Sequence, residues 1–184
     1  MNKMSIFLVL PVMMFFLLTT ISCDEEGNAD ENFSESFSGS FQSGPAITDT
    51  NDDGAPASLA DLAGDSTFGP VTIQSTNEFM LIAPTGACPQ GNLQFTLVRG
   101  NFIKRFEETG ELLFGTWFTG TSCFNPTTKN SETTQNGEFT GGTGQFANAT
   151  GPVEIVFSSN DLATTSEDGF RFGATVGNGT GILE

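Results

Sequence analysis

The chain has 184 residues, a formal net charge of -16 at pH 7, no histidine and no tyrosine, whereas phenylalanine occurs 19 times. So acidic a chain repels nucleic acid and anionic lipid headgroups, which argues against nucleic-acid binding. The absence of histidine excludes Ser-His-Asp and Cys-His mechanisms and histidine-based zinc sites within the chain. No residue pattern identifies a reaction.

The N-terminal segment has the parts of a secretory signal. Lys3 supplies a positive charge, an apolar run follows over residues 6–18, and Thr20-Ile21-Ser22-Cys23 resembles the processing site of bacterial lipoproteins, with Thr20 where leucine is usual. We predict a signal peptide over residues 1–22 and a lipid on Cys23. Two alternatives are an uncleaved anchor helix over residues 4–22, which nearly reaches membrane-spanning length, and a cleaved secretory peptide without lipid.

A lipid on Cys23 would place the protein outside the cytoplasm, in a bacterial cell envelope, with the membrane as its partner. More than one acyl chain gives stable attachment. The acidic residues directly after Cys23 resemble a signal for export to the outer surface, so we expect the outer membrane or cell surface rather than the periplasmic face of the inner membrane. Residues 23–35 are small, polar and acidic, and we predict that they form a flexible linker.

From residue 36 onward, alternating apolar and polar positions predict short strands. One short helix is expected over residues 57–63, with Ser58 as its cap. Many short strands with frequent turns are typical of a sandwich or an antiparallel barrel, and Gly115 and Gly173 in mid-strand suit the bends of a small barrel. We predict one all-β domain over residues 36–184, an antiparallel β-barrel of about eight strands. The expected strands are 36–42, 68–75, 79–83, 93–97, 102–106, 111–119, 138–146, 153–157 and 170–176.

Two cysteines remain once Cys23 is assigned to lipid. In an oxidising compartment Cys88 and Cys123 are expected to pair, and closing their loop is worth about 3 to 4 kcal/mol in the chain-entropy model. The alternative is two free buried thiols. A catalytic thiol is not expected, because no histidine is present to activate it.

One acidic turn has oxygen ligands at the spacing of a calcium loop. The segment Asp49-x-Asn51-x-Asp53-Gly54 copies the first half of an EF-hand loop, but the twelfth position, where a bidentate glutamate should stand, comes one residue before Asp61. An acidic Asx-type turn is the favoured alternative. A calcium site formed by Asp49, Asn51 and Asp53, with Asp61 as a further ligand, is therefore the second hypothesis for this segment.

The segment 141–151 has the sequence G-G-T-G-Q-F-A-N-A-T-G. A phosphate cradle would need a helix start after the glycines, and here Pro152 and a strand follow. The pattern resembles the motif of the allene oxide cyclase and dirigent-like barrel group. The resemblance takes in residues 49–57 and would span residues 34–184. It implies an eight-stranded antiparallel barrel with a central cavity, and no catalytic role is carried over from it.

The carboxylates of Glu78, Glu107, Glu108, Glu111 and Glu154 lie on or near strands, and Glu154 is the first candidate for acid-base chemistry. Strand alternation puts it opposite Val153 and Ile155, hence either in solvent or in the barrel cavity. Lys104-Arg105 and Arg171 are the main candidates to pair with it. For all of these residues a solvated surface position is the default.

Three functions follow from these features. The favoured one is a membrane-anchored, non-enzymatic β-barrel module that binds a small apolar ligand or a surface partner. An isomerase or cyclase resembling allene oxide cyclase or dirigent proteins is the first alternative, and an inward-facing, poorly solvated carboxylate would support it. Calcium-dependent surface adhesion is the second alternative.

Overall fold

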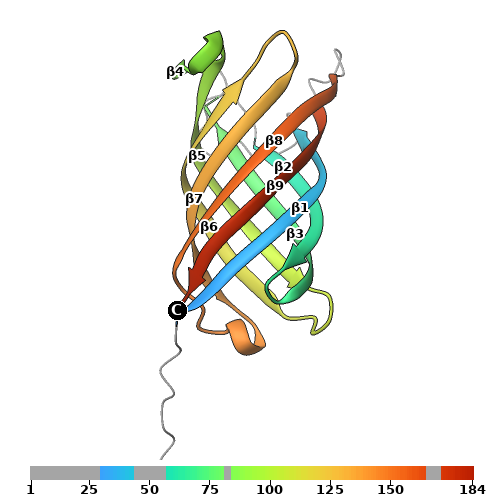
Figure 1. Cartoon of the computed structure of the whole chain (residues 1–184), viewed down its shortest axis with the longest axis vertical. Coiled ribbons are helices and arrows are strands. Elements are labelled where there is room, and N and C mark those ends of the chain that lie inside the picture. The colour runs from blue at the N-terminus through green and yellow to red at the C-terminus, as the bar shows by residue number, and fades with distance from the viewer. Residues whose placement is uncertain (1–29, 44–56, 81–83, 165–170) are drawn as a thin grey trace, which may run out of the picture.

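The computed structural model describes residues 30–43, 57–80, 84–164 and 171–184. These residues form strands, and a short 3-10 helix lies in each of two of the connections between them (Figure 1). The elements are β1 (Glu31–Ser43), β2 (Ser58–Ser66), β3 (Gly69–Phe79), β4 (Gly86–Ala87), η1 (Pro89–Gly91), β5 (Leu93–Phe106), β6 (Leu112–Phe124), β7 (Asn130–Gly142), η2 (Gly144–Phe146), β8 (Pro152–Thr164) and β9 (Arg171–Leu183).

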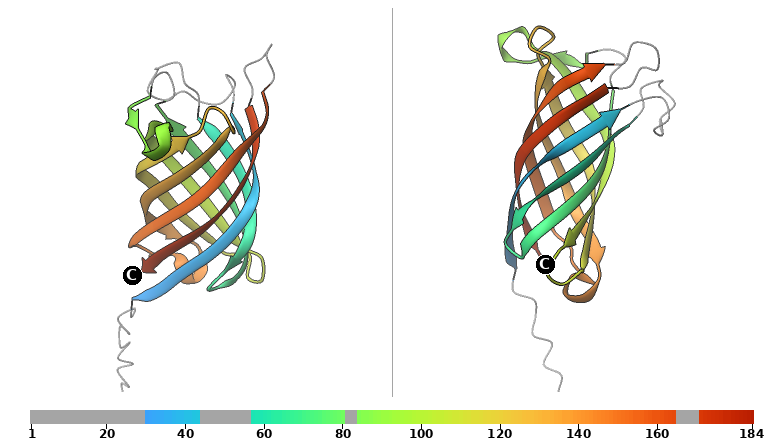
Figure 2. Two further views of the ribbon diagram at one scale, coloured as in Figure 1. Left: turned by 45° about the horizontal axis from the view of Figure 1, so that its top comes forward. Right: turned by 90° about the vertical axis from the view of Figure 1, so that its right-hand side faces the viewer.

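Eight of the strands close into an antiparallel barrel, as predicted. The order is β3-β2-β1-β9-β8-β7-β6-β5, and β5 pairs with β3 to close the sheet. Strand β4 is an addition to this barrel and pairs with Leu93 and Gln94 at the start of β5. Closure removes the unpaired edges that an open sheet would expose. The strands tilt around a single axis, as the two views of Figure 2 show.

The predicted helix over residues 57–63 is wrong, because residues 58–63 lie in strand β2. Ala60 and Leu62 point into the barrel and Asp61 points out, which is strand alternation. Ser58 does not cap a helix, since its hydroxyl donates to the Asn77 carbonyl on β3 at 3.1 Å. Hydrogen bonding to a strand on each side outweighs the helical preference of a short Leu- and Ala-rich segment.

Other boundaries differ as well. Strands β6, β8 and β9 run on to Phe124, Thr164 and Leu183, and the strand expected over residues 79–83 is not found where the chain is described, since Phe79 ends β3, Met80 follows it and residues 81–83 lie outside the described ranges. Strand β1 begins at Glu31, so residues 31–35, expected in the linker, belong to the barrel. Strand β7 begins at Asn130 rather than residue 138. Strand β5 is one continuous element rather than two, and the irregularity in its pairing with β3 falls at Glu78/Phe79.

One end of the barrel is filled with aromatic rings, and we call it the closed end. Phe146 stacks on Phe106 with ring centroids 4.6 Å apart and meets Phe68 edge-on at 5.2 Å. Phe33 meets Phe139 edge-on at 5.4 Å. All except the half-buried Phe68 are at most 3 % exposed. These rings form a dense core of the kind that stabilises a barrel by apolar burial.

The glycine-rich segment 141–151 builds the connection between β7 and β8 at this closed end, near the C-terminus (Figure 2). Gly141 and Gly151 have φ values of +121° and +110°, which L side chains rarely adopt. Between them, η2 carries Phe146 into the core. The glycines therefore permit a tight connection between β7 and β8, from which Phe146 enters the core.

Candidate functional site

The opposite half of the barrel, toward the end of β1 and the start of β2, holds a cavity of about 480 Å³ among the described residues, and we call it the open half. Side chains from all eight barrel strands contribute to its wall. The apolar lining residues are Phe37, Phe41, Ala60, Leu62, Ile73, Phe79, Phe95, Trp117, Phe124, Ile155 and Phe157. The polar lining residues are Glu35, Ser43, Ser58, Ser75, Asn77, Lys104, Ser122, Lys129, Ser131, Thr133, Ser159, Asp161 and Thr175.

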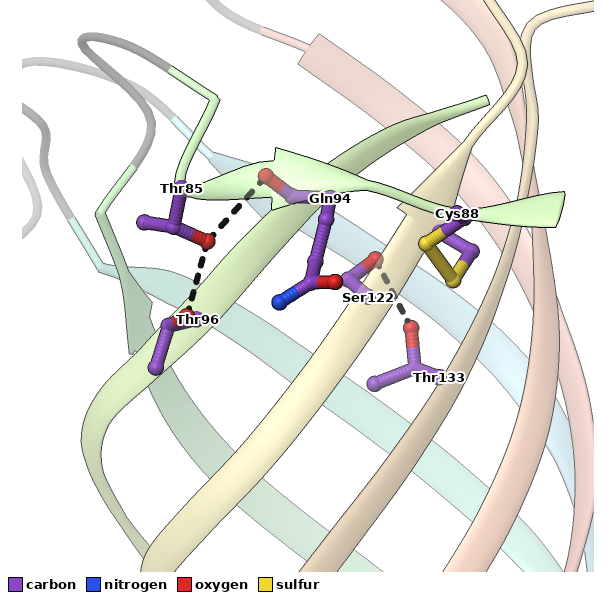
Figure 3. The surroundings of a disulfide bond; sticks show 7 residues. Thr85, Cys88, Gln94, Thr96, Ser122 and Thr133 are labelled. Carbon is purple, nitrogen blue, oxygen red and sulfur yellow. Dashed lines mark hydrogen bonds between the residues drawn. A yellow bond between two sulfur atoms is a disulfide. The ribbon is translucent and has the colours of Figure 1, made fainter. Parts of the chain in front are cut away.

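The hydroxyl groups on the cavity wall are partly paired with one another. Thr133 donates to Ser122 at 3.0 Å between β7 and β6 (Figure 3), and Ser159 and Thr175 lie 2.8 Å apart between β8 and β9. The wall thus alternates aromatic faces with small hydroxyls, which gives it both apolar surface and hydrogen-bonding groups.

A fully buried ion pair forms the floor of this cavity. Glu35 on β1 and Lys104 on β5 are 0 % and 1 % exposed in their side chains, and the Lys104 ammonium donates to Glu35 Oε1. Each charge sits between two inward-facing phenylalanines of its own strand, in the segments 33–37 and 102–106. Gly179 on β9 leaves the space for the carboxylate, since a Cβ there would come within 2.6 Å of Glu35 Oε1.

The surroundings of Lys104 are aromatic as well as acidic. Its Nζ lies 5.1 Å from the centroid of the Phe33 ring and 4.9 Å from that of Phe102, within cation-π range. Burial lowers the pKa of Lys104 below its ordinary value of 10.5, and the neighbouring Glu35 carboxylate opposes that shift through its charge and hydrogen bond. Oxygen Oε2 of Glu35 has no hydrogen-bond partner among the described residues.

A short polar relay runs up the wall from Trp117. The indole Nε1 donates to Ser75 Oγ at 3.3 Å, and Ser75 donates to Asn77 Oδ1 at 3.4 Å. Trp117 is the sole tryptophan of the chain and only 2 % exposed. Its fluorescence is therefore a built-in reporter of the cavity.

The predicted disulfide is confirmed. Cys88, directly before η1, bonds to Cys123 on β6, with Cα atoms 5.8 Å apart and the two cysteines 35 positions apart in sequence (Figure 3). Beside it, Thr85 donates to the Gln94 carbonyl at 3.2 Å and lies 2.8 Å from the Thr96 hydroxyl. The bond attaches the β4–η1 segment to the open end of the barrel.

Lys104, one of the candidates to pair with Glu154, pairs with Glu35 instead, and Glu154 has the solvated position that was the default for it. Glu154 is exposed on the outer face of β8, so it offers no buried carboxylate to the cavity. Arg105 also faces outward, 3.9 Å from Glu107, and the side chain of Arg171 lies outside the described residues.

Sequence patterns do not identify Glu35 as a site residue, because the predicted linker over residues 23–35 includes it. The signal was present, because Phe33-x-Glu35-x-Phe37 and Phe102-x-Lys104-x-Phe106 both put a charge on the face that carries phenylalanines. A second buried carboxylate, Glu78 on β3, pairs with Arg99 at 3.2 Å and is not part of the cavity wall.

Two other predicted sites lie outside the part of the chain that the structure describes. They are Cys23 and the acidic turn with Asp49, Asn51 and Asp53. Asp61 is described, and it is exposed on β2, where it accepts a hydrogen bond from Gln74 at 3.1 Å. Within the described ranges, no group of three or more His, Cys, Asp or Glu residues could hold a metal ion.

The described segments also contain no helix of the length and apolarity that a membrane span requires. Comparisons with protein-family models, with curated proteins and with solved structures find no match for this chain. The resemblance to the allene oxide cyclase and dirigent-like group therefore remains a prediction from the glycine-rich motif.

Proposed function

We propose that this protein is a lipid-anchored, extracytoplasmic binding protein that holds one small, largely apolar molecule in the open half of its barrel. The cavity carries this proposal. Its volume of about 480 Å³ lies within the range of small-molecule sites, and its wall combines aromatic faces with a few hydrogen-bonding groups.

The distribution of polar groups supports a binding role. A barrel of this size can be filled with side chains, as its closed end is, whereas the open half leaves space and lines it with serines and threonines. The buried ion pair at the floor is weak evidence for stability, because replacing such a pair with packed apolar residues often stabilises a protein. The cavity and the ion pair occupy positions where packed apolar side chains would stabilise the fold more. This favours a ligand site over a purely structural barrel.

The proposed location has its own support. Disulfides persist mainly in oxidising compartments, and this domain contains one at its open end. The lipobox-like segment ending at Cys23 then provides attachment to the outer membrane or the cell surface, and the membrane supplies apolar molecules to the barrel.

A fluorescence titration tests the binding role. An environment-sensitive apolar dye is added to the mature domain, and both the dye emission and the quenching of Trp117 are followed. We expect saturable one-to-one binding with a change at Trp117. The variant Ser159→Phe places a ring in the cavity and should weaken both signals, whereas Ser36→Phe on the outer face of β1 is the matched control and should leave both unchanged. An affinity that Ser159→Phe leaves unchanged would place the ligand elsewhere.

Mass spectrometry of protein purified from its own membrane tests the anchor. We expect a mature chain that begins at Cys23 and carries acyl groups, and a Cys23→Ala variant that moves to the aqueous phase on detergent partition. A wild-type chain that retains residues 1–22, or one that begins at Cys23 without lipid, would contradict the proposed attachment.

An isomerase or cyclase is the second candidate, and Glu35 is the observation that favours it. This carboxylate is buried and faces the cavity, where it could polarise a reactive ligand. The test supplies an allene oxide generated in place and measures the enantiomer ratio of the cyclised product, with Glu35→Gln as the comparison. A racemic product from the wild type would remove this candidate.

A further inference from the structure

At the floor of the cavity, Glu35 and Lys104 neutralise each other, and the Glu35 carboxylate can still accept a hydrogen bond. We propose that the ligand is an uncharged amphipathic molecule with a hydroxyl group at one end, that it enters hydroxyl first, and that this hydroxyl donates a hydrogen bond to Glu35 Oε2. Because this assignment deepens the proposed function, its test must separate failure of the ligand class from failure of binding itself.

The first step concerns what the floor lacks. Glu35 Oε1 accepts from Lys104, but Oε2 is buried and has no partner among the described residues. A buried carboxylate oxygen left unpaired is costly, and the cost disappears when a donor arrives. Glu35 is among the residues that line the cavity, and its side chain is 0 % exposed, so a ligand hydroxyl reaches Oε2 by displacing the side chains that cover the floor.

The second step concerns charge. Lys104 neutralises Glu35, and its ammonium is enclosed by that carboxylate and the rings of Phe33 and Phe102. A ligand carboxylate would bring a second negative charge to a neutral, desolvated site, and a ligand ammonium would bring a second positive one. Either would bury a net charge without a counter-ion. A hydroxyl supplies a proton donor without charge, which selects alcohols over acids and amines of the same skeleton.

The third step concerns the rest of the ligand. Above the floor, the wall is rich in aromatic residues contributed by β1, β3, β5, β6 and β8: Phe37, Phe41, Phe79, Phe95, Trp117, Phe124 and Phe157. These faces suit a hydrocarbon body. Lys129, Asp161 and Ser131 also line the cavity, and Lys129 is exposed and Asp161 half-buried. Entry with the polar group leading therefore matches both the buried acceptor and the apolar wall.

The experiment compares four molecules with one hydrocarbon skeleton: decanol, decyl methyl ether, decanoate and decylamine. Each displaces the apolar dye from the mature domain while Trp117 fluorescence is recorded. We expect decanol to bind about tenfold or more tightly than the ether, the size expected of a hydrogen bond to a charged acceptor. Decanoate and decylamine should bind no better than the ether.

Two variants locate the preference. Glu35→Leu combined with Lys104→Met replaces the ion pair by apolar side chains of similar volume, and circular dichroism checks the fold. In this double variant decanol and its ether should bind equally. The matched control, Ser131→Ala, removes a different wall hydroxyl and should keep the wild-type preference.

The outcomes separate the two claims. Equal affinity of decanol and its ether in the wild type, tightest binding by decanoate or decylamine, or an alcohol preference that survives in the double variant would each overturn the hydroxyl-first ligand while leaving the binding role intact. If neither the dye nor any of the four molecules binds saturably, both the ligand class and the proposed function are overturned.

Discussion

The same strands build both halves of the barrel, but the side chains that point inward differ between the two halves. In the closed half, inward positions carry Phe33, Phe106, Phe139 and other rings that touch one another. In the open half, the same strands carry serine and threonine as well as phenylalanine at inward positions, and the interior of the barrel stays unfilled. The Glu35–Lys104 pair stands at the boundary.

This difference indicates a division of labour. We expect the packed rings of the closed end to supply most of the stability and the open half to supply the binding capacity. A barrel held together by backbone hydrogen bonds can tolerate an empty interior at one end only if the other end is well packed. Four predictions can break or sharpen this division, in order of falling effect.

The largest effect is expected at the boundary. Glu35→Gln leaves the Lys104 ammonium buried without a counter-ion, and we expect a loss of about 3 to 5 kcal/mol in the free energy of unfolding. The double change Glu35→Leu with Lys104→Met should be near neutral or stabilising. Denaturant unfolding measures both. A double variant that loses more than Glu35→Gln alone would show that the pair itself stabilises the fold.

Next comes the contrast between rings of the two halves. Phe146→Ala empties a packed site at the closed end and should cost about 3 to 5 kcal/mol. Phe41→Ala removes a half-buried ring that faces the cavity and should cost less than about 2 kcal/mol, while weakening dye binding. Thermal and denaturant unfolding of both variants checks the ranking. Equal losses would mean that the open half is packed as tightly as the closed half in solution.

Removal of the disulfide should act on the open half. Replacing Cys88 and Cys123 by alanine is expected to lower the free energy of unfolding by about 3 to 4 kcal/mol in the chain-entropy model. Hydrogen exchange should rise most in β4 and at the start of β5, and least around Phe106 and Phe139. Uniform acceleration across both ends would argue against separate roles for the two halves.

The smallest effect is expected from alkaline pH. Burial lowers the pKa of Lys104 below 10.5, despite the opposing influence of Glu35, so the unfolded chain holds more protons than the folded one between the folded pKa and 10.5. In that window the Lys104 contribution to the free energy of unfolding should rise with pH, and below it the penalty is fully present.

The absence of tyrosine keeps this window clear of phenol titration. Unfolding measured from about pH 8 to about pH 10 should show the rise in the wild type and not in the Glu35→Leu, Lys104→Met variant. A flat wild-type profile, or the same slope in both proteins, would contradict it.

Much of the architecture was accessible from sequence patterns, and the misses have physical reasons. The helix expected at residues 57–63 failed because a nine-residue strand paired on both sides overrides local preference. The first half of β7 was missed because Ser131, Thr133 and Gln135 face inward, and an apolar/polar alternation cannot be seen where the inward side is itself polar.

Which face of β6 points into the barrel could not be predicted from its sequence either. Leu113, Gly115 and Trp117 alternate with Leu112, Phe114, Thr116 and Phe118. The structure buries the set with Trp117, while Phe118 is 55 % exposed. Gly115 belongs inside because the Phe102 ring takes its space, with a Cβ there only 2.0 Å from that ring. That constraint comes from a neighbouring strand and is invisible in the segment itself.

By itself the sequence determined a β-rich domain of many short strands, a pairing of Cys88 with Cys123, and the exclusion of histidine chemistry, because alternation, cysteine number and composition are local properties of the chain. Only the tertiary structure decided that Glu35 meets Lys104 and that one half of the barrel is filled while the other is hollow. Both depend on register and closure, which bring residues 69 positions apart to one point and set which side chains share the interior.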